Sequence, residues 1–247
     1  MKGLVKLIWV EFKLYMRQPQ AAFFTLAFPL LLLFMFGSIY GNKPTPFFGG
    51  RGMVDVSTPA YIAIIMGSTG LMSISIVVST YREKGVLRRF RATPLRPAAI
   101  LGSQVAVNYV MTLAGTLILV AGAKLVYHMR FNGAVGAVFL GFTLSTLSFL
   151  AVGFLIASVA RTSRVASILG MLFYFPNIFL SGATVPKEIF PGAMRSFSKV
   201  LPMTHVVNLL QGLWIGNPWG KHITELVVLA GFLVVGVVVS AKAFRWE

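Results

Sequence analysis

Cysteine is absent from the chain of 247 residues, and acidic residues are scarce, with six Asp and Glu against 22 Lys and Arg. The lack of cysteine excludes disulfides, iron–sulfur clusters, thiolate zinc sites and thiol catalysis. The three histidines are too scattered to suggest a metal site. No cluster of acids, histidines or activated nucleophiles is visible, so we expect neither a bound metal nor enzymatic catalysis.

Charge is also scarce: 11% of the residues are charged and 57% are hydrophobic, whereas a soluble domain has about 25% charged residues. About 20 apolar residues of helix cross a bilayer. The pattern predicts an all-α polytopic membrane protein, formed as a single transmembrane domain over residues 1–247. Six segments are long and apolar enough to span, namely 21–40, 59–80, 98–127, 133–160, 165–184 and 223–243.

No Asp or Glu lies inside the six predicted spans, and Glu225 stands at the edge of the last one. Intramembrane acids are the usual carriers of proton or sodium coupling, so an ion-driven carrier is disfavoured. The loop segment 49–52 is glycine-rich, but no Gly-Lys-Ser/Thr follows it, and no Walker A loop is present elsewhere.

The net charge of +16 suggests either nucleic acid or anionic lipid as a partner. The basic residues flank the apolar segments, which favours membrane lipids and argues against nucleic acid. With both termini inside, fourteen Lys and Arg residues lie on the inner side and eight on the outer side. The positive-inside rule therefore predicts a multi-pass protein of the cytoplasmic membrane with cytoplasmic N- and C-termini.

Two segments outside the spans have a pattern of their own. In residues 1–18 four cations share one helical side and apolar residues cover the other, which favours an amphipathic helix at the cytoplasmic interface over a disordered basic tail. These cations are Lys2, Lys6, Lys13 and Arg17, and the apolar residues are Leu4, Val5, Ile8, Phe12 and Tyr15. Prolines divide residues 185–219 into short amphipathic pieces, which predicts re-entrant helices on the external side between spans five and six.

The segment 81–97 between spans two and three holds six of the 22 Lys and Arg residues. As a helix, its first part gathers apolar residues on one side and cations on two others, and prolines then end it. Such a projecting element suits docking to a cytoplasmic partner. A solvated charge run that only sets topology is the alternative. The acid Glu83 could pair within the segment or reach the basic N-terminal helix.

One run in this segment resembles the first cytoplasmic loop of ABC-2 type transporter permeases, namely Arg82-Glu83-Lys84-Gly85-Val86-Leu87-Arg88-Arg89-Phe90-Arg91-Ala92-Thr93-Pro94. The region between spans five and six is similar to the same family in Leu180-Ser181-Gly182, Val185-Pro186, Phe190-Pro191 and Leu201-Pro202-Met203-Thr204-His205. One departure is Gln211-Gly212-Leu213-Trp214, where many relatives have an arginine, so no role of that charge is transferred.

The resemblance implies a cytoplasmic coupling helix that sits on an ATPase subunit. It implies coupling residues Arg82, Glu83, Gly85, Val86, Leu87, Arg88, Arg89, Phe90, Arg91, Thr93 and Pro94. It also implies a substrate pathway along spans two and five. The candidates there are Met66, Met72, Ser73, Ser75, Phe173, Tyr174, Phe175 and Asn177. Residues of these types are more often packing or lipid-facing than substrate-binding.

The resemblance implies the permease half of an ATP-driven exporter for an amphiphilic or lipid-like compound, such as a drug or antibiotic, that works by alternating access. Two copies of an ABC ATPase, which bind ATP and magnesium, and a second permease copy would complete it as a homo- or heterodimer. The alternatives are a membrane-embedded enzyme acting on lipid-like substrates and a sensor or assembly partner without ATPase coupling.

Overall fold

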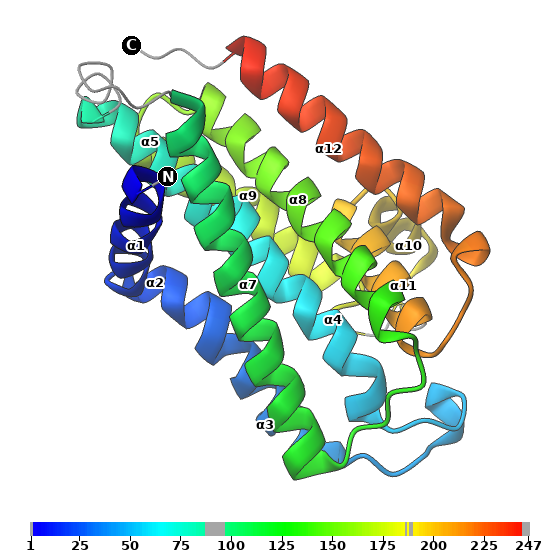
Figure 1. The fold of residues 1–247 in the computed structure, drawn as a ribbon. Helices are drawn as coiled ribbons and strands as arrows, with labels where there is room; N and C mark the ends of the chain where they lie inside the picture. Colours follow the sequence, from blue (N-terminus) through cyan, green and yellow to red (C-terminus); the bar gives the residue numbers. More distant parts are fainter. Residues whose placement is uncertain (1, 87–96, 186, 188–189, 244–247) are drawn as a thin grey trace.

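The computed structural model describes residues 2–86, 97–185, 187 and 190–243 (Figure 1). Helices and their connecting loops make up the described residues. The helices are α1 (Lys2–Met16), α2 (Pro19–Ala22), η1 (Phe23–Ala27), α3 (Phe28–Tyr40), η2 (Pro46–Phe48), α4 (Met53–Gly67), η3 (Ser68–Ile74), α5 (Ser75–Glu83), α7 (Pro97–Tyr127), α8 (Val135–Val159), α9 (Ser163–Leu180), α10 (Gly192–Ser198), α11 (Pro202–Trp214), η5 (Trp219–His222) and α12 (Ile223–Ala243).

Six stretches of continuous helix are long and apolar enough to cross a membrane, which confirms the predicted all-α polytopic class. They are Pro19–Tyr40, Met53–Glu83, Ala99–Tyr127, Val135–Val159, Ser163–Leu180 and Trp219–Lys242. Each overlaps one of the six predicted segments, because a run of about 20 apolar residues has few alternatives to a spanning helix.

The second span begins at Met53, earlier than predicted. The charged Asp55 can lie in its first turn because three hydrogen bonds within the protein satisfy the carboxylate. Asp55 accepts hydrogen bonds from the backbone N–H of Gly52 at 3.3 Å, from the Asn42 amide at 2.8 Å and from the backbone N–H of Arg130 at 2.8 Å. A carboxylate at a helix N-terminus also compensates the positive end of the helix dipole. Asp55 therefore anchors two loops to the start of α4.

The second span is the central helix of the bundle. In its most apolar 18-residue window 94% of the residues are buried, whereas the share is 17–56% in the other five spans. Figure 1 shows α4 running through the middle of the bundle, and α3, α7, α8, α9 and α11 all contact it. The other spans expose one side, which is the expected arrangement for helices that face lipid.

Two glycines allow α8 to lie directly against the middle of this central helix. A Cβ at Gly70 would come within 2.6 Å of the Phe149 backbone, and a Cβ at Gly153 would overlap the Gly70 carbonyl. Small residues let helix backbones approach closely, which favours van der Waals packing in a membrane. Contact between α8 and η3 thus depends on a missing side chain from each helix.

Two π-helical segments, η1 and η3, meet in the apolar interior through hydroxyl groups. The Tyr15 hydroxyl lies 2.8 Å from Thr25 Oγ1, which lies 3.3 Å from Ser68 Oγ. Burial raises the pKa of Tyr15 to about 12, against the smaller opposite effect of its hydrogen bond with Thr25, so this hydroxyl stays neutral. On the other side of η3, Thr112 donates to Thr69 at 2.9 Å. This neutral polar seam joins α1, the first span, the central helix and α7.

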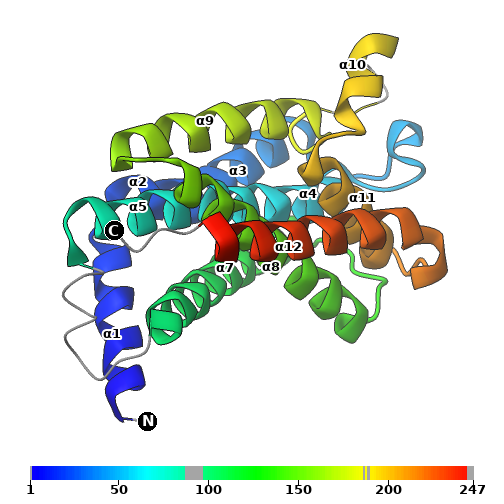
Figure 2. The ribbon, with the colours of Figure 1, turned by 90° about the horizontal axis from the view of Figure 1, so that it is seen from above.

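The two ends of the bundle differ. Figure 2 shows α1 and the C-terminal end of α12 at one end and α10, α11 and the loop before α4 at the other. Helix α11 is short, yet most of its residues are buried against α4, α8, α9 and α12. At the first end, α1 packs its Ile8, Phe12 and Tyr15 side against Val107 and Met111 of α7. An amphipathic helix at the membrane interface would turn its apolar side toward the lipid, whereas this apolar side contacts protein.

The close approach of α8 predicts a specific loss of stability in Gly153→Ala. The new methyl group must push α8 away from the central helix, which should lower the free energy of unfolding by about 1–3 kcal/mol. Gly231→Ala is the matched control, since nothing lies within 4 Å of a Cβ there and alanine favours helix. Thermal unfolding of both variants in detergent tests this, and equal melting temperatures would contradict the close contact.

Candidate functional site

The last turn of α5, where the predicted coupling segment begins, makes side-chain polar contacts with three other helices. The Tyr81 hydroxyl donates to Glu11 of α1 at 2.6 Å. The Glu83 carboxylate accepts from the backbone N–H of Ser163, at the start of α9, at 2.8 Å. Arg82 approaches the carbonyl of Ser158, near the end of α8, at 3.5 Å. A displacement of this turn would therefore act on α1, α8 and α9 together.

The hydrogen bond between α5 and the N-terminal helix α1 is not made by Glu83, the residue that the sequence suggested. Glu83 was expected to pair within its segment or to reach the N-terminal helix, but it binds the free N–H at the start of α9. The N-terminal helix is held instead by Glu11, whose side chain is buried. The sequence analysis assigned no role to Glu11. Its buried position depends on the packing of α1 against α5 and α7, which the sequence does not reveal.

The described part of the predicted coupling residues ends at Val86. Gly85 has φ of +65°, a left-handed conformation that favours glycine and ends α5. The coupling helix itself stays a prediction. The members of the predicted set that lie outside the described residues are Leu87, Arg88, Arg89, Phe90, Arg91, Thr93 and Pro94.

Two of the predicted pathway residues line a cavity of about 420 Å³ next to this junction. Met72 and Ser73 come from η3, and the opposite wall is formed by the elbow between α1 and α2. The Ser73 hydroxyl is buried and has no hydrogen-bond partner among the described residues. The complete lining is Arg17, Gln18, Pro19, Gln20, Ala21, Phe24, Ser68, Met72, Ser73, Ile76, Val77, Thr80 and Tyr81. We call this space the inner cavity.

Four other pathway candidates are packed inside the bundle. Met66 is fully buried, and Ser75 donates to the Gly153 carbonyl at 3.0 Å. Tyr174 donates to the Ile64 carbonyl at 3.2 Å. Asn177 donates to the Phe173 carbonyl at 2.8 Å, and its amide oxygen accepts from the Met203 N–H at 3.1 Å, which fastens the start of α11. In this conformation these side chains hold helices together.

The remaining two candidates, Phe173 and Phe175, are exposed on α9 by 51% and 39%. Phe175 lies 6.4 Å from Phe24 between ring centroids, and Tyr174 lies 6.0 Å from the same ring. Phe24 also lines the inner cavity, so it connects the cavity to the aromatic side of α9. Phe24 and Arg17 were not among the predicted pathway residues, because the resemblance implied spans two and five only, whereas these two residues come from the first span and the end of the N-terminal segment.

The sequence model of the ABC-2 type transporter family matches residues 3–214. The chain belongs to this family. The match includes α1, the central helix, α9 and α11, and so confirms the resemblance seen in the two motifs. As a member with six helices long and apolar enough to cross a membrane, the chain is a permease of the ABC-2 type.

Several permeases of this family are similar to the chain. The inner membrane transport permease YhhJ of Escherichia coli K12 is 23% identical over 79% of this chain, which spans about half of YhhJ, 52% of its length. The daunorubicin resistance ABC transporter permease protein DrrB1 of Streptomyces coeruleorubidus is 27% identical over 88% of this chain and 77% of its own. The probable doxorubicin resistance ABC transporter permease protein DrrC of Mycobacterium tuberculosis (strain CDC 1551 / Oshkosh) is 25% identical, with 88% and 79% covered.

The bond between α1 and α5 predicts that Tyr81→Phe loosens α1 without unfolding the spans. A hydrogen bond to a charged group contributes about 1.5–3 kcal/mol, so backbone amides of α1 should exchange hydrogen about tenfold faster or more. Hydrogen–deuterium exchange of the purified chain measures this. Tyr40→Phe, at an exposed tyrosine on α3, is the control. Unchanged exchange in α1 of the Tyr81 variant would show that the bond does not hold the helix.

Proposed function

We propose that the chain is the transmembrane permease subunit of an ATP-driven exporter of amphiphilic or lipid-like compounds. Family membership supports a transport role, and one observation about this chain supports the mechanism. The inner cavity adjoins the same turn of α5 from which the predicted coupling segment continues, since Tyr81 both lines the cavity and binds α1. A push on that turn would thus reach the cavity wall directly.

In this proposal, closure of a partner ATPase pushes on residues 82–94, and the end of α5 transmits the displacement. Three helices held by that turn then tilt together, because their contacts to it are polar and specific. The inner cavity lies between the elbow of α1 and α2 and the central helix. Relative movement of these two walls would open the cavity to the cytoplasmic side in one state and close it in the other.

The lining of the inner cavity suits an amphiphile. Its walls include Phe24, Met72 and Ile76, and flexible or aromatic side chains of this kind adapt to apolar ligands of varied shape. Arg17 and Gln18 supply polar groups at the α1–α2 elbow. The names of DrrB1 and DrrC concern resistance to daunorubicin and doxorubicin, so these drugs are suitable probes for the chain.

The rest of the assembly follows the same proposal. Two copies of an ABC ATPase bind ATP and Mg²⁺ on the cytoplasmic side, and a second permease, identical or related, completes the membrane part. We place both termini in the cytoplasm and the chain in the cytoplasmic membrane. Exposed apolar side chains on α9, such as Ile168, Leu172 and Phe179, are available to the second permease or to lipid.

Replacing Arg88, Arg89 and Arg91 together by Gln should uncouple ATP hydrolysis from transport. Each charge-assisted contact to an acidic partner contributes about 1.5–3 kcal/mol, so loss of three should weaken ATPase binding by more than tenfold. Copurification of the ATPase and ATP-dependent doxorubicin uptake into inverted vesicles measure both effects. The control removes three cations on the opposite side of the protein, in Lys43→Gln, Lys124→Gln and Lys199→Gln. Equal transport by both triple variants would refute the coupling role.

Met72→Trp should block the inner cavity while leaving the coupling end intact. The larger ring fills space that a substrate would occupy, and we expect roughly tenfold lower doxorubicin uptake, equal to about 1.4 kcal/mol of lost substrate binding. ATPase copurification should not change. The matched control is Met194→Trp, at an exposed position on α10 outside the cavity. Normal uptake by the Met72 variant would exclude the inner cavity from the pathway.

A further inference from the structure

A second cavity, of about 500 Å³, lies at the end of the bundle that holds α11 and the loop before α4. We call it the outer cavity. Its walls are the start of α4, the segment after α9, one side of α11 and the start of α12. Val56, Pro59 and Ile215 give it an apolar part, and the remaining lining is rich in charged and amide side chains. The pathway candidates from the sequence do not line it.

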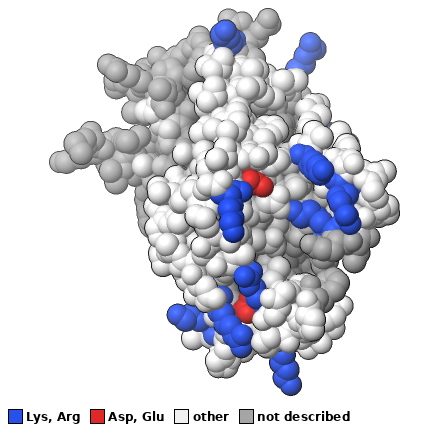
Figure 3. All heavy atoms as spheres, turned by 90° about the vertical axis from the view of Figure 1, so that its right-hand side faces the viewer, with Lys and Arg blue, Asp and Glu red and all other residues white. Residues whose placement is uncertain are grey.

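Cations are in excess in this cavity. Arg51, Lys187 and Lys221 line it, together with the acids Asp55 and Glu225. Among the described residues, the side chains of Arg51 and Lys221 have no ion-pair partner. Figure 3 shows the side of the molecule that is at the right of Figure 1, where Lys and Arg gather around small acidic areas. A cavity with this charge balance attracts anions.

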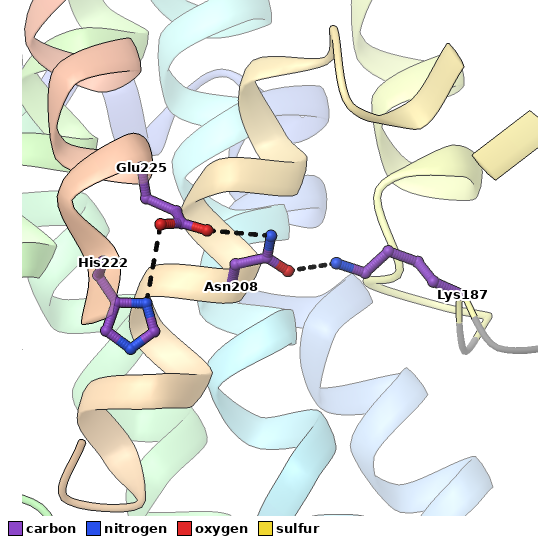
Figure 4. A network of polar contacts seen from close by, with 4 residues as sticks. All are labelled: Lys187, Asn208, His222 and Glu225. Atoms are coloured by element: carbon purple, nitrogen blue, oxygen red, sulfur yellow. Dashed lines mark hydrogen bonds and ion pairs between the residues drawn. The ribbon is translucent and has the colours of Figure 1, made fainter. Parts of the chain in front are cut away.

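The two acids are already engaged by the protein. The carboxylate of Asp55 accepts three hydrogen bonds at the start of α4. Glu225 accepts from the Asn208 amide at 3.4 Å and lies 3.8 Å from Nδ1 of His222. Lys187 donates to the oxygen of the same Asn208 amide, so the four residues form one connected network (Figure 4). The donors that remain for a ligand are mainly the side-chain N–H groups of Arg51 and Lys221.

The network is built into the packing of α11 and α12. His222 is only 8% exposed, and neither ring nitrogen has a hydrogen-bond partner among the described residues. A Cβ at Gly212 would overlap the His222 ring, so the ring lies directly on the α11 backbone. The chain therefore positions its polar groups here by close helix contact, which preorganises the cavity for a ligand.

We propose that the outer cavity binds a phosphate group, with Arg51 and Lys221 as its principal cationic contacts. A phosphate carries several acceptor oxygens and no obligatory donor, and guanidinium groups bind it through two parallel hydrogen bonds. The apolar part of the lining suits the adjoining chain of a lipid. The phosphate could belong to a lipid headgroup or to free inorganic phosphate, and this proposal does not depend on ATP-driven export.

The test measures binding to the purified full chain in detergent with three probes. They are inorganic phosphate, short-chain phosphatidylglycerol and short-chain diacylglycerol, which has no phosphate. Thermal stabilisation against probe concentration gives each apparent Kd. Binding of inorganic phosphate supports the proposal and shows that the site recognises the phosphate group without a lipid chain. Binding of phosphatidylglycerol only supports a lipid headgroup site. Equal binding of diacylglycerol overturns the proposal.

Charge variants locate the site. Arg51→Gln and Lys221→Gln should each weaken phosphate-probe binding by roughly ten- to hundredfold, as expected for a lost charge-assisted hydrogen bond. Lys43→Gln is the matched control for Arg51, since it removes the same charge from the same loop without lining the cavity. Equal weakening in Lys43→Gln and Arg51→Gln would show only diffuse attraction to a basic surface and would overturn the proposal.

Glu225→Gln tests the sign of the ligand charge. Removal of this acid should tighten binding of the phosphate probe by several-fold, because a repulsive charge is lost while an amide can still contact Asn208 and His222. Weaker binding in this variant, together with unchanged binding in Arg51→Gln, would show that the cavity prefers cations and would overturn the proposal. Melting temperatures without probe confirm that each variant is folded.

Discussion

The burial of the second span on all sides is the constraint on which the rest of the structure depends. A helix without a lipid-facing side has mainly protein groups as partners for its polar atoms, and this one changes to π-helical geometry at mid-length. Side-chain hydroxyl groups bind backbone carbonyls in the π-helical segment. Ser68 donates to the Ile65 carbonyl at 2.8 Å, and the Thr69 hydroxyl lies 3.1 Å from the same carbonyl. Further hydroxyls from α1, η1 and α7 join them. The neutral seam thus fixes how four elements are arranged around the centre.

The central helix consequently connects the outer cavity, the inner cavity and the last turn of α5. The stretch Met53–Glu83 would be about 46 Å long as a regular helix, roughly the full thickness of a bilayer with its headgroups. Its first turns line the outer cavity, its π segment lines the inner cavity, and its last turn holds α1, α8 and α9. Because the second span is almost entirely covered by protein, displacement of one of its ends must move the neighbouring helices. This arrangement suits transmission between the two sides.

The sequence predicted the spans well because a long apolar run permits little else. The prolines of residues 185–219 predicted short helices there, and α10 and α11 are short helices, whereas their re-entrant placement on the external side stays a prediction. It could not predict which side of a helix faces a cavity. Met72 and Tyr174 were equal candidates, yet one lines the inner cavity and the other bonds to the Ile64 carbonyl. The difference arises from the rotation of each helix against its neighbours, and apolar runs without polar periodicity do not encode that rotation. For the same reason the anchoring roles of Asp55 and Glu11 were missed.

The N-terminal helix is joined to the last turn of α5 and packs against α7 rather than standing apart as a separate anchor. Glu11 binds the last turn of α5 through Tyr81, and four residues later Tyr15 contacts Thr25 in the π segment of the first span. Helix α1 therefore links the end of the central helix to the first third of the first span by a second route, outside the central helix itself. A force on α5 then reaches the mid-membrane seam from two directions, and the inner cavity lies between them. The walls of the inner cavity would rearrange whenever helix α1 and the central helix are displaced by different amounts.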